Sequence, residues 1–209
     1  MHYLFYDTET GGTNPQLHSI LTAYFIIYNE KWEKLDELEI FLKPNSGDPI
    51  AVQEALDVTG IDIKTHLKDP RTVTYQEGKD ILLDFLEKHK IKGKRRHFRP
   101  CGQNIGFDEG FIMSQLVPEL EWRKLVHYRA LDTLTILTFL QDLGFLPKDL
   151  GNLESQVEYF NIPKGKAHDA KEDVRMTVDV YKAYCSLLAD KKDSISGVST
   201  NNLLSIIER

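Results

Sequence analysis

Cysteine is scarce in this sequence, and long hydrophobic runs and a basic leader are missing from it. The two cysteines, Cys101 and Cys185, are too few for a framework of disulfide bonds and lack the paired spacing of a zinc site. No run of about 18 apolar residues occurs, so no transmembrane helix is expected. The first residues lack a basic region followed by an apolar segment and a cleavage site, which argues against export. We therefore expect a protein of the reducing cytoplasm that has no membrane partner.

The sequence has fewer basic than acidic residues. The chain has 26 lysines and arginines against 32 aspartates and glutamates, which gives a net charge of −6 at pH 7. This balance argues against a strongly electrostatic nucleic-acid binder, but it is compatible with an enzyme that holds phosphates through bound metal ions. The length of 209 residues favours one domain, which we place at residues 1–190, followed by a tail at 191–209.

The pattern of apolar residues predicts an α/β fold in which strands come first. Strands are expected at 3–8, 20–28, 38–42, 101–104 and 126–130. Helices are expected at 52–58, 76–89, 108–116, 134–140, 153–160 and 169–188. A run of strands followed by alternating helices and strands is typical of a mixed sheet that has helices against its faces.

The segment DTETGG, residues 7–12, places two carboxylates at the end of the first expected strand. Alternate residues of a strand share a face, so Asp7 and Glu9 project from the same side at its C-terminal end. Open α/β sheets bind ligands beyond the C-terminal ends of their strands, which makes this end a candidate site. The alternative is that the pair only caps a turn before Gly11 and Gly12.

Two further carboxylates occupy positions where apolar residues belong. Each interrupts the apolar stripe of an expected helix, and the stripes are Asp108, Phe111, Ile112 and Leu116, and Ala170, Asp173, Val174, Thr177, Val178 and Tyr181. A buried carboxylate without a partner is unstable or becomes protonated. Neither stripe contains a lysine or an arginine, which favours compensation by a divalent metal, and carboxylate oxygens suit Mg²⁺ or Mn²⁺.

Three motifs, in this order, resemble those of the DEDD exonuclease superfamily. They are DTET at 7–10, NIGFD at 104–108 and HDAKED at 168–173, and ALDVTGI and LDTLTI are lesser matches. The step from His168 to Asp173 is similar to that of the DEDDh branch, which includes polymerase proofreading subunits, oligoribonuclease and ribonuclease T. The resemblance runs from about Tyr3 to Leu188.

The resemblance implies a ribonuclease-H-like fold, with a mixed five-stranded sheet and helices on both faces. It implies a 3′ to 5′ exonuclease that acts on single-stranded DNA or RNA 3′ ends. Two divalent cations, Mg²⁺ or Mn²⁺, would be held by Asp7, Glu9, Asp108 and Asp173, with His168 as the general base. The set is chemically consistent, because two cations stabilise the attacking and leaving oxygens of a displacement at phosphorus and histidine titrates near neutral pH.

Substrate contacts are expected around these motifs. The resemblance suggests that Thr8 and Thr10 meet the terminal nucleotide, and Lys164 and Lys166 are placed to meet phosphate. Asn104 either fixes its loop or touches the site.

Three other features are expected outside the catalytic set. The loop at 90–99 carries six basic residues and no acids, so it either follows a phosphate backbone or forms a solvated charged surface. Phe107 is expected in the core rather than against a base. Asp132 is expected to cap a helix that starts near Thr133.

Two other functions stay open. A catalytically inactive exonuclease-like domain would serve as an interaction module, although the sequence lacks no member of the catalytic set. A related metal-dependent endonuclease would cut a substrate whose 3′ end is blocked. The tail at 191–209 is interpreted as a polar linker that ends in a short apolar helix, LLSII. That helix either docks on a polymerase or another replication or repair protein, or packs on its own domain.

Overall fold

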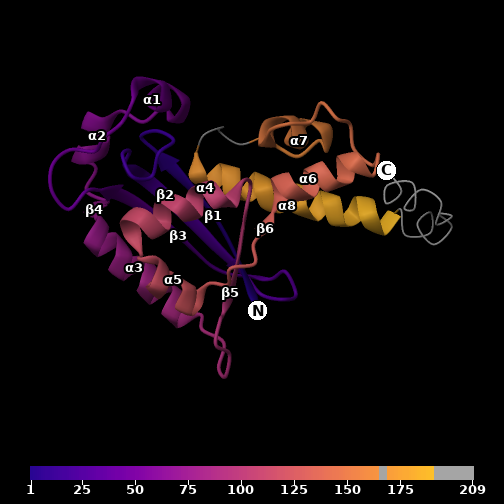
Figure 1. Cartoon of the computed structure of the whole chain (residues 1–209), viewed down its shortest axis with the longest axis horizontal. Helices are drawn as coiled ribbons and strands as arrows, with labels where there is room; N and C mark the ends of the chain where they lie inside the picture. The colour runs from indigo at the N-terminus through magenta and orange to yellow at the C-terminus, as the bar shows by residue number, and fades with distance from the viewer. Residues whose placement is uncertain (165–168, 191–209) are drawn as a thin grey trace.

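The computed structural model describes residues 1–164 and 169–190, whose strands form a mixed sheet (Figure 1). In these residues the strand order is β4-β3-β2-β1-β5-β6. The strands are β1 His2–Thr10, β2 Ile20–Tyr28, β3 Lys34–Lys43, β4 Thr72–Thr74, β5 Phe98–Gly102 and β6 Leu131–Asp132. The pairs β1–β2 and β2–β3 are antiparallel, and the pairs β1–β5, β3–β4 and β5–β6 are parallel. Strands β1 and β2 therefore lie at the centre of the sheet.

The predicted α/β class is confirmed, but the strands differ in two places. The sequence does not predict β4, because its three residues are too short to show a period. Where a strand is predicted at 126–130, Val126 forms an isolated bridge to Phe98, and pairing with β5 resumes only at Leu131–Asp132. The described part of the sheet thus has six strands rather than the five expected.

Helices cover both faces of the sheet, as the sequence predicts (Figure 1). They are α1 Gln53–Thr59, α2 Ile63–Lys68, α3 Tyr75–Lys88, α4 Ile105–Phe111, the π-helix η1 Ile112–Leu116, α5 Glu119–Leu125, α6 Thr133–Asp142, α7 Leu153–Tyr159 and α8 Ala170–Asp190. One hydrophobic core joins the sheet to α3, α4, η1 and α5, and a second joins the opposite face to α8. A third cluster packs α6 and α7 against α8. No helix of the described residues combines the length and the apolar character needed to cross a membrane.

Strand β1 is buried because its residues alternate between the two layers. Leu4 and Tyr6 belong to the core under α3 and α5, whereas Phe5 belongs to the core under α8. The same alternation directs Asp7 and Glu9 toward the side of α8. The C-terminal end of β1 therefore carries acidic groups on the face that α8 covers.

The turn after β1 brings a separate helix to the end of this strand. Gly11 donates its N–H to the carbonyl oxygen of Ser19 at 2.8 Å, and its own carbonyl accepts the N–H of Val52 at 2.7 Å. A Cβ atom at Gly11 would lie 2.4 Å from the carbonyl oxygen of Ile50, so glycine is needed for this close approach. The contact places α1 beside the acidic end of β1.

Candidate active site

Carboxylate side chains converge where the end of β1 meets the start of α8. Among the described residues, Asp7, Glu9 and Asp173 each place an oxygen within 4.8 Å of the others. Glu9 is 8% exposed, and the two aspartates are half-buried. Asp173 reaches this position because Val174, its neighbour on α8, packs in the same core cluster as Phe5 of β1. The packing of α8 on the sheet thus assembles the acidic cluster.

Asp108 approaches the same strand end from the opposite layer. It is 3% exposed, and its Oδ1 accepts hydrogen bonds from the backbone N–H of Thr8 at 2.9 Å and from the Thr8 hydroxyl at 2.8 Å. Thr8 stands between Asp7 and Glu9 in the chain, so these bonds hold Asp108 next to the other acids. The structure brings three of the four predicted acids into direct proximity and places the fourth beside them.

The environment of these acids favours their protonated forms. Burial and the charges of Asp173 and Asp108 raise the pKa of Glu9 to about 8. Burial, followed by the charges of Asp108, Glu9 and Asp173, raises the pKa of Asp7 well above its usual range. Burial also raises the pKa of Asp108, although its two hydrogen bonds from Thr8 oppose that shift. A bound cation would reverse this effect, because it stabilises the ionised carboxylates.

Among the described residues, the charges that act most strongly on Asp7 and Glu9 are negative. The charges that act on Asp7 come from Asp108, Glu9 and Asp173, and those that act on Glu9 come from Asp173, Asp108 and Asp169. Within residues 1–164 and 169–190, no lysine or arginine forms an ion pair with Asp7 or Glu9. A donor set made of carboxylate oxygens matches the ligands that Mg²⁺ and Mn²⁺ prefer. The residues present therefore fit divalent metal.

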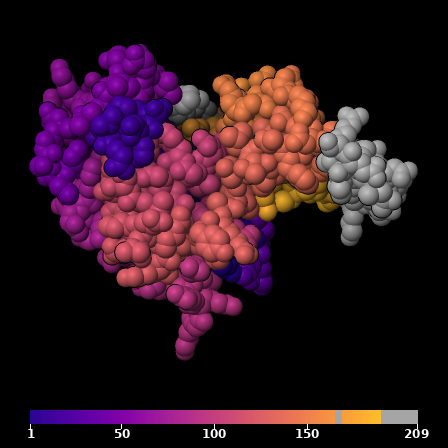
Figure 2. All heavy atoms as spheres, viewed as in Figure 1, coloured from indigo at the N-terminus to yellow at the C-terminus, as the bar shows by residue number. Residues whose placement is uncertain are grey.

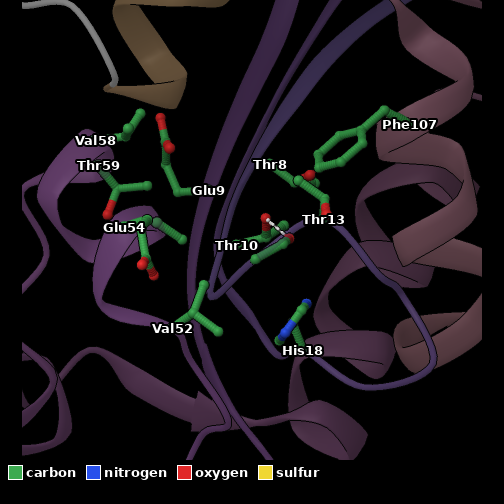
Figure 3. Close-up of a pocket in the computed structure, with 12 residues that line it drawn as sticks. Thr8, Glu9, Thr10, Thr13, His18, Val52, Glu54, Val58, Thr59 and Phe107 are labelled. Carbon is green, nitrogen blue, oxygen red and sulfur yellow. Dashed lines mark hydrogen bonds between the residues drawn. The ribbon is translucent and has the colours of Figure 1, made fainter.

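A cavity of about 400 Å³ opens beside Glu9 (Figure 3). Its lining comes from the end of β1, the following turn, α1 and α4, and consists of Thr8, Glu9, Thr10, Gly12, Thr13, His18, Val52, Glu54, Ala55, Val58, Thr59 and Phe107. Figure 3 shows Val58 and Phe107 on opposite sides of the cavity, with Glu9 between them. A cavity with apolar side chains in its walls can hold a planar group next to the carboxylate cluster.

The contribution of α1 to this cavity was not predicted as part of a site. Val52, Ala55 and Val58 repeat at helical spacing, a signal that is present in the sequence but that also describes an ordinary core face. In the structure, Val52 is 40% exposed and Val58 is 55% exposed, so this face does not pack into the core. Only the position of α1 next to β1 identifies it as a cavity wall.

The predicted substrate contacts have other partners within the chain. The Thr10 hydroxyl donates to the carbonyl oxygen of Gly12 at 2.7 Å, as the dashed line in Figure 3 marks. Asn104 is exposed, has a left-handed backbone with φ of 55°, and donates its N–H to Asp132 at 2.9 Å. This geometry supports the loop-fixing alternative for Asn104. Lys164 lies 3.3 Å from Glu154.

Two predicted site residues, His168 and Lys166, lie outside the described residues. Two other predictions can be compared with the structure. Asp132 caps α6 by accepting the N–H of Leu134 at 2.9 Å, which confirms the predicted cap. Phe107 packs against Phe111 with ring centroids 5.1 Å apart, as expected of a core residue, but it also lines the cavity.

The chain resembles solved exonuclease structures over nearly its whole length. No protein-family model and no curated protein matches the sequence. E. coli exonuclease I in complex with a dT13 oligonucleotide is 18% identical, with a TM-score of 0.67 over 98% of this chain and 45% of that chain. The zinc-bound form of the E. coli exonuclease I–ssDNA complex is 19% identical, with a TM-score of 0.72 over 98% of this chain and 44% of that chain. Exonuclease I from Methylocaldum szegediense is 22% identical, with a TM-score of 0.66 over 92% of this chain and 41% of that chain.

The present chain spans less than half the length of each of these exonucleases. At these identities the likeness concerns the fold. The chain therefore has a ribonuclease-H-like α/β fold, similar to that of exonuclease I.

Proposed function

We propose that the chain is a divalent-metal-dependent nuclease that shortens single-stranded nucleic acids from their 3′ ends. One observation carries the proposal: Asp7, Glu9 and Asp173 gather their oxygens within 4.8 Å at the C-terminal end of a central strand. The fold adds support, because structurally similar proteins are exonucleases in complex with single-stranded DNA.

Asp7, Glu9 and Asp173 would hold the metal, with Asp108 contributing from the side of α4. Two bound Mg²⁺ or Mn²⁺ ions would supply positive charge that stabilises the attacking and leaving oxygens at phosphorus. The cavity beside Glu9 would receive the terminal nucleotide, and the apolar side chains of Val58 and Phe107 would flank its base. This arrangement would orient the last phosphodiester toward the carboxylates.

We assign to His168 the removal of a proton from the attacking water. Histidine suits this role because its pKa lies close to physiological pH. The placement of the next residue supports the assignment, since the charge of Asp169 contributes to the raised pKa of Glu9.

The assay that tests this function uses 5′-labelled single-stranded DNA and RNA of matched sequence, each with a free or a blocked 3′ end. With Mg²⁺ or Mn²⁺ we expect substrates with free 3′ ends to give a ladder of progressively shorter labelled products. We expect no products in excess chelator. Internal cleavage of the blocked substrates would indicate the related endonuclease instead. Intact substrates in the presence of bound metal would indicate the inactive interaction module.

Replacing His168 by alanine tests the proton acceptor. We expect the single-turnover rate to fall about 10²-fold or more, because a general base contributes at least that much to the chemical step. Metal affinity should stay close to that of the wild type, since His168 is not assigned as a ligand. Titration of Mn²⁺ alongside the rate measurement separates the two effects, and a rate within a few-fold of wild type would remove His168 from the mechanism.

A further inference from the structure

A cluster of arginine and aromatic side chains lies at the opposite end of the sheet from the carboxylates. Arg99 is in β5, where it pairs with Tyr3 near the start of β1. The loop before β5 and the segment after α5 add the other members. The cluster, called here the arginine–tyrosine patch, consists of Arg96, Arg99, His127, Tyr128 and Arg129.

The patch is organised around an exposed tyrosine ring. Arg96 and Arg129 place their guanidinium carbons 5.7 Å and 5.6 Å from the ring centroid of Tyr128. The imidazole of His127 stacks on the same ring, with centroids 4.5 Å apart and planes inclined by 29°. Tyr128 is 58% exposed. A largely exposed aromatic ring thus lies beside two guanidinium groups and an imidazole.

The arginines of the patch have no acidic partner among residues 1–164 and 169–190. In the described part of the chain, Arg96, Arg99 and Arg129 form no salt bridge within 4.0 Å, whereas the neighbouring Arg123 is held by Glu109 at 2.7 Å. Burial and the charges of Arg96, Arg129 and Arg99 lower the pKa of His127, as expected when the three guanidinium groups surround this imidazole. Their gathering is notable on a chain whose net charge is −6.

The patch is well separated from the carboxylates. Tyr3 and Glu9 are six residues apart in β1, and at about 3.3 Å per residue this corresponds to roughly 20 Å. In Figure 1 the loop before β5 projects from the end of the molecule opposite to α1, and Figure 2 shows that it stands clear of the surrounding surface. This loop adds the exposed cations Lys92, Lys94 and Arg95 next to the patch.

We propose that the arginine–tyrosine patch is a second binding surface for single-stranded nucleic acid, which holds the strand upstream of the 3′ end that enters the site. The nature of the ligand rests on the proposed function. Guanidinium groups bind phosphates, and an exposed tyrosine ring stacks on a base of any sequence. An acidic peptide would use the charges of the patch but would make no use of the exposed part of the Tyr128 ring.

The test is fluorescence anisotropy of a 5′-labelled oligothymidylate of about 20 nucleotides, longer than the ~4–16 nucleotides that a typical single-strand module covers. The full chain is used in excess chelator, so binding is measured without hydrolysis. The test variant is Arg96→Gln/Arg129→Gln. The matched control is Lys148→Gln/Lys182→Gln, which changes the net charge equally at exposed lysines paired with Asp142 and Asp179.

We expect the patch variant to bind at least about fivefold more weakly than the control. The slope of log K against log salt concentration should become shallower by about 1.4, which is ~0.7 for each of two lost phosphate contacts. Tyr128→Ala should weaken binding by about fivefold or more without changing the salt dependence, because stacking is uncharged. Tyr128, Arg129, Lys148 and Lys182 are exposed and Arg96 is half-buried, and equal melting temperatures would verify that the variants are folded.

Equal affinities of the patch and control variants would overturn the inference. So would a patch-dependent affinity for a polyglutamate peptide that exceeds the affinity for the oligonucleotide. Failure of the proposed function is distinguishable from both results. It would appear as an absence of metal-dependent hydrolysis while patch-dependent binding in chelator persists.

Discussion

The protonation of a few carboxyl groups determines how the site behaves without metal. The pKa of Glu9 is raised to about 8 by burial and by Asp173 and Asp108, and burial moves the pKa of Asp7 in the same direction. Divalent ions bind ionised carboxylates, so protons and metal compete for the same oxygens. Burial therefore favours the protonated forms of Asp7 and Glu9 in the absence of metal, and a bound cation would favour their ionised forms.

The raised pKa of Glu9 predicts how the metal-free protein responds to pH. Its pKa of about 8 in the folded protein exceeds its ordinary value of 4.5, so protonated Glu9 contributes its full stabilisation below about pH 4.5 and loses it as the pH rises through 8. We expect the melting temperature in chelator to fall between pH 5 and 8.5. At ~1.4 kcal/mol per pKa unit, the effect on the free energy of unfolding is at most a few kcal/mol.

Glu9→Gln should make this decline shallower, because the amide does not ionise. Some decline should persist, since Asp7 and Asp108 also have raised pKa values. Asp149→Asn, a change at an exposed acid, serves as the control and should follow the wild type. If Glu9→Gln declines as steeply as the control, Glu9 is not protonated in the folded protein.

Removing the Thr8 hydroxyl tests the link between Asp108 and the end of β1. In Thr8→Val the hydroxyl donor at 2.8 Å is lost and the backbone donor at 2.9 Å stays. The pKa of Asp108 should rise further and the affinity of the cluster for metal should fall. The loss of binding free energy should be at most about 1.5–3 kcal/mol, the contribution of one hydrogen bond to a charged group. The melting temperature, recorded as Mn²⁺ is titrated, measures the affinity for metal and the stability of the metal-free variant.

Thr10→Val is the matched control for this change. Thr10 is on the same strand, but its hydroxyl donates to a backbone carbonyl, that of Gly12. The control should lose stability without altering metal affinity. Equal losses of metal affinity in Thr8→Val and Thr10→Val would show that the hydroxyl of Thr8 has no specific role.

Sequence reasoning identifies the acids but not the contacts that surround them. Asp108 and Asp173 are visible because each breaks an apolar stripe, and Asp7 and Glu9 because they follow a buried strand. The bond from Thr8 to Asp108 joins residues 100 positions apart and depends on the packing of α4 against β1. No local pattern in the sequence encodes that distance.

At the scale of elements, a partly buried polar anchor fixes α4 against α5. The carboxylate of Glu109 accepts the indole N–H of Trp122 at 2.9 Å and two guanidinium N–H groups of Arg123 at 2.7 Å. Glu109 directly follows Asp108, so the anchor also limits rotation of the helix that carries this acid. Beyond the anchor, α4 continues as the π-helix η1, which ends at Leu116.

Arg123→Met tests this anchor. The change removes the bidentate pair and leaves a partly buried Glu109 with one donor, so we expect the free energy of unfolding to fall by about 1–3 kcal/mol. Denaturant unfolding gives the value. Lys124→Met, at the exposed neighbouring position, is the control and should change stability by about 0.5 kcal/mol or less. Equal effects of the two changes would show that the pair contributes nothing specific to the position of α4.

The elements that could be predicted are those with a strong period. The run ILTAYFIIY predicts β2 at 20–28, and its bounds are confirmed. The prediction of a strand at 126–130 is wrong, because Val126 forms only an isolated bridge with β5 and regular pairing begins at Leu131. Short strands and π-helical turns depend on their neighbours, so their own residues do not determine them.

At the scale of the whole molecule, opposite charges gather at opposite ends of the sheet. The acidic end carries the residues proposed to bind metal, and the other end carries the arginine–tyrosine patch. A single-stranded nucleic acid that reached from one end of the sheet to the other would be held by the arginines of the patch at one end. Metal bound by the acids would hold it at the other end. The tail at 191–209 lies outside the described residues, so its docking role stays a prediction.

Direct measurement of metal binding tests the central claim, that the carboxylates of β1 and α8 form a divalent-metal centre. Mn²⁺ is titrated by calorimetry into the wild type, Asp7→Asn and the control Asp149→Asn at pH 8. We expect the wild type and the control to bind Mn²⁺ with the same affinity and Asp7→Asn to bind about tenfold or more weakly, since even outer-shell changes at metal sites cost about 10–100-fold. Equal affinity in all three proteins would contradict the claim.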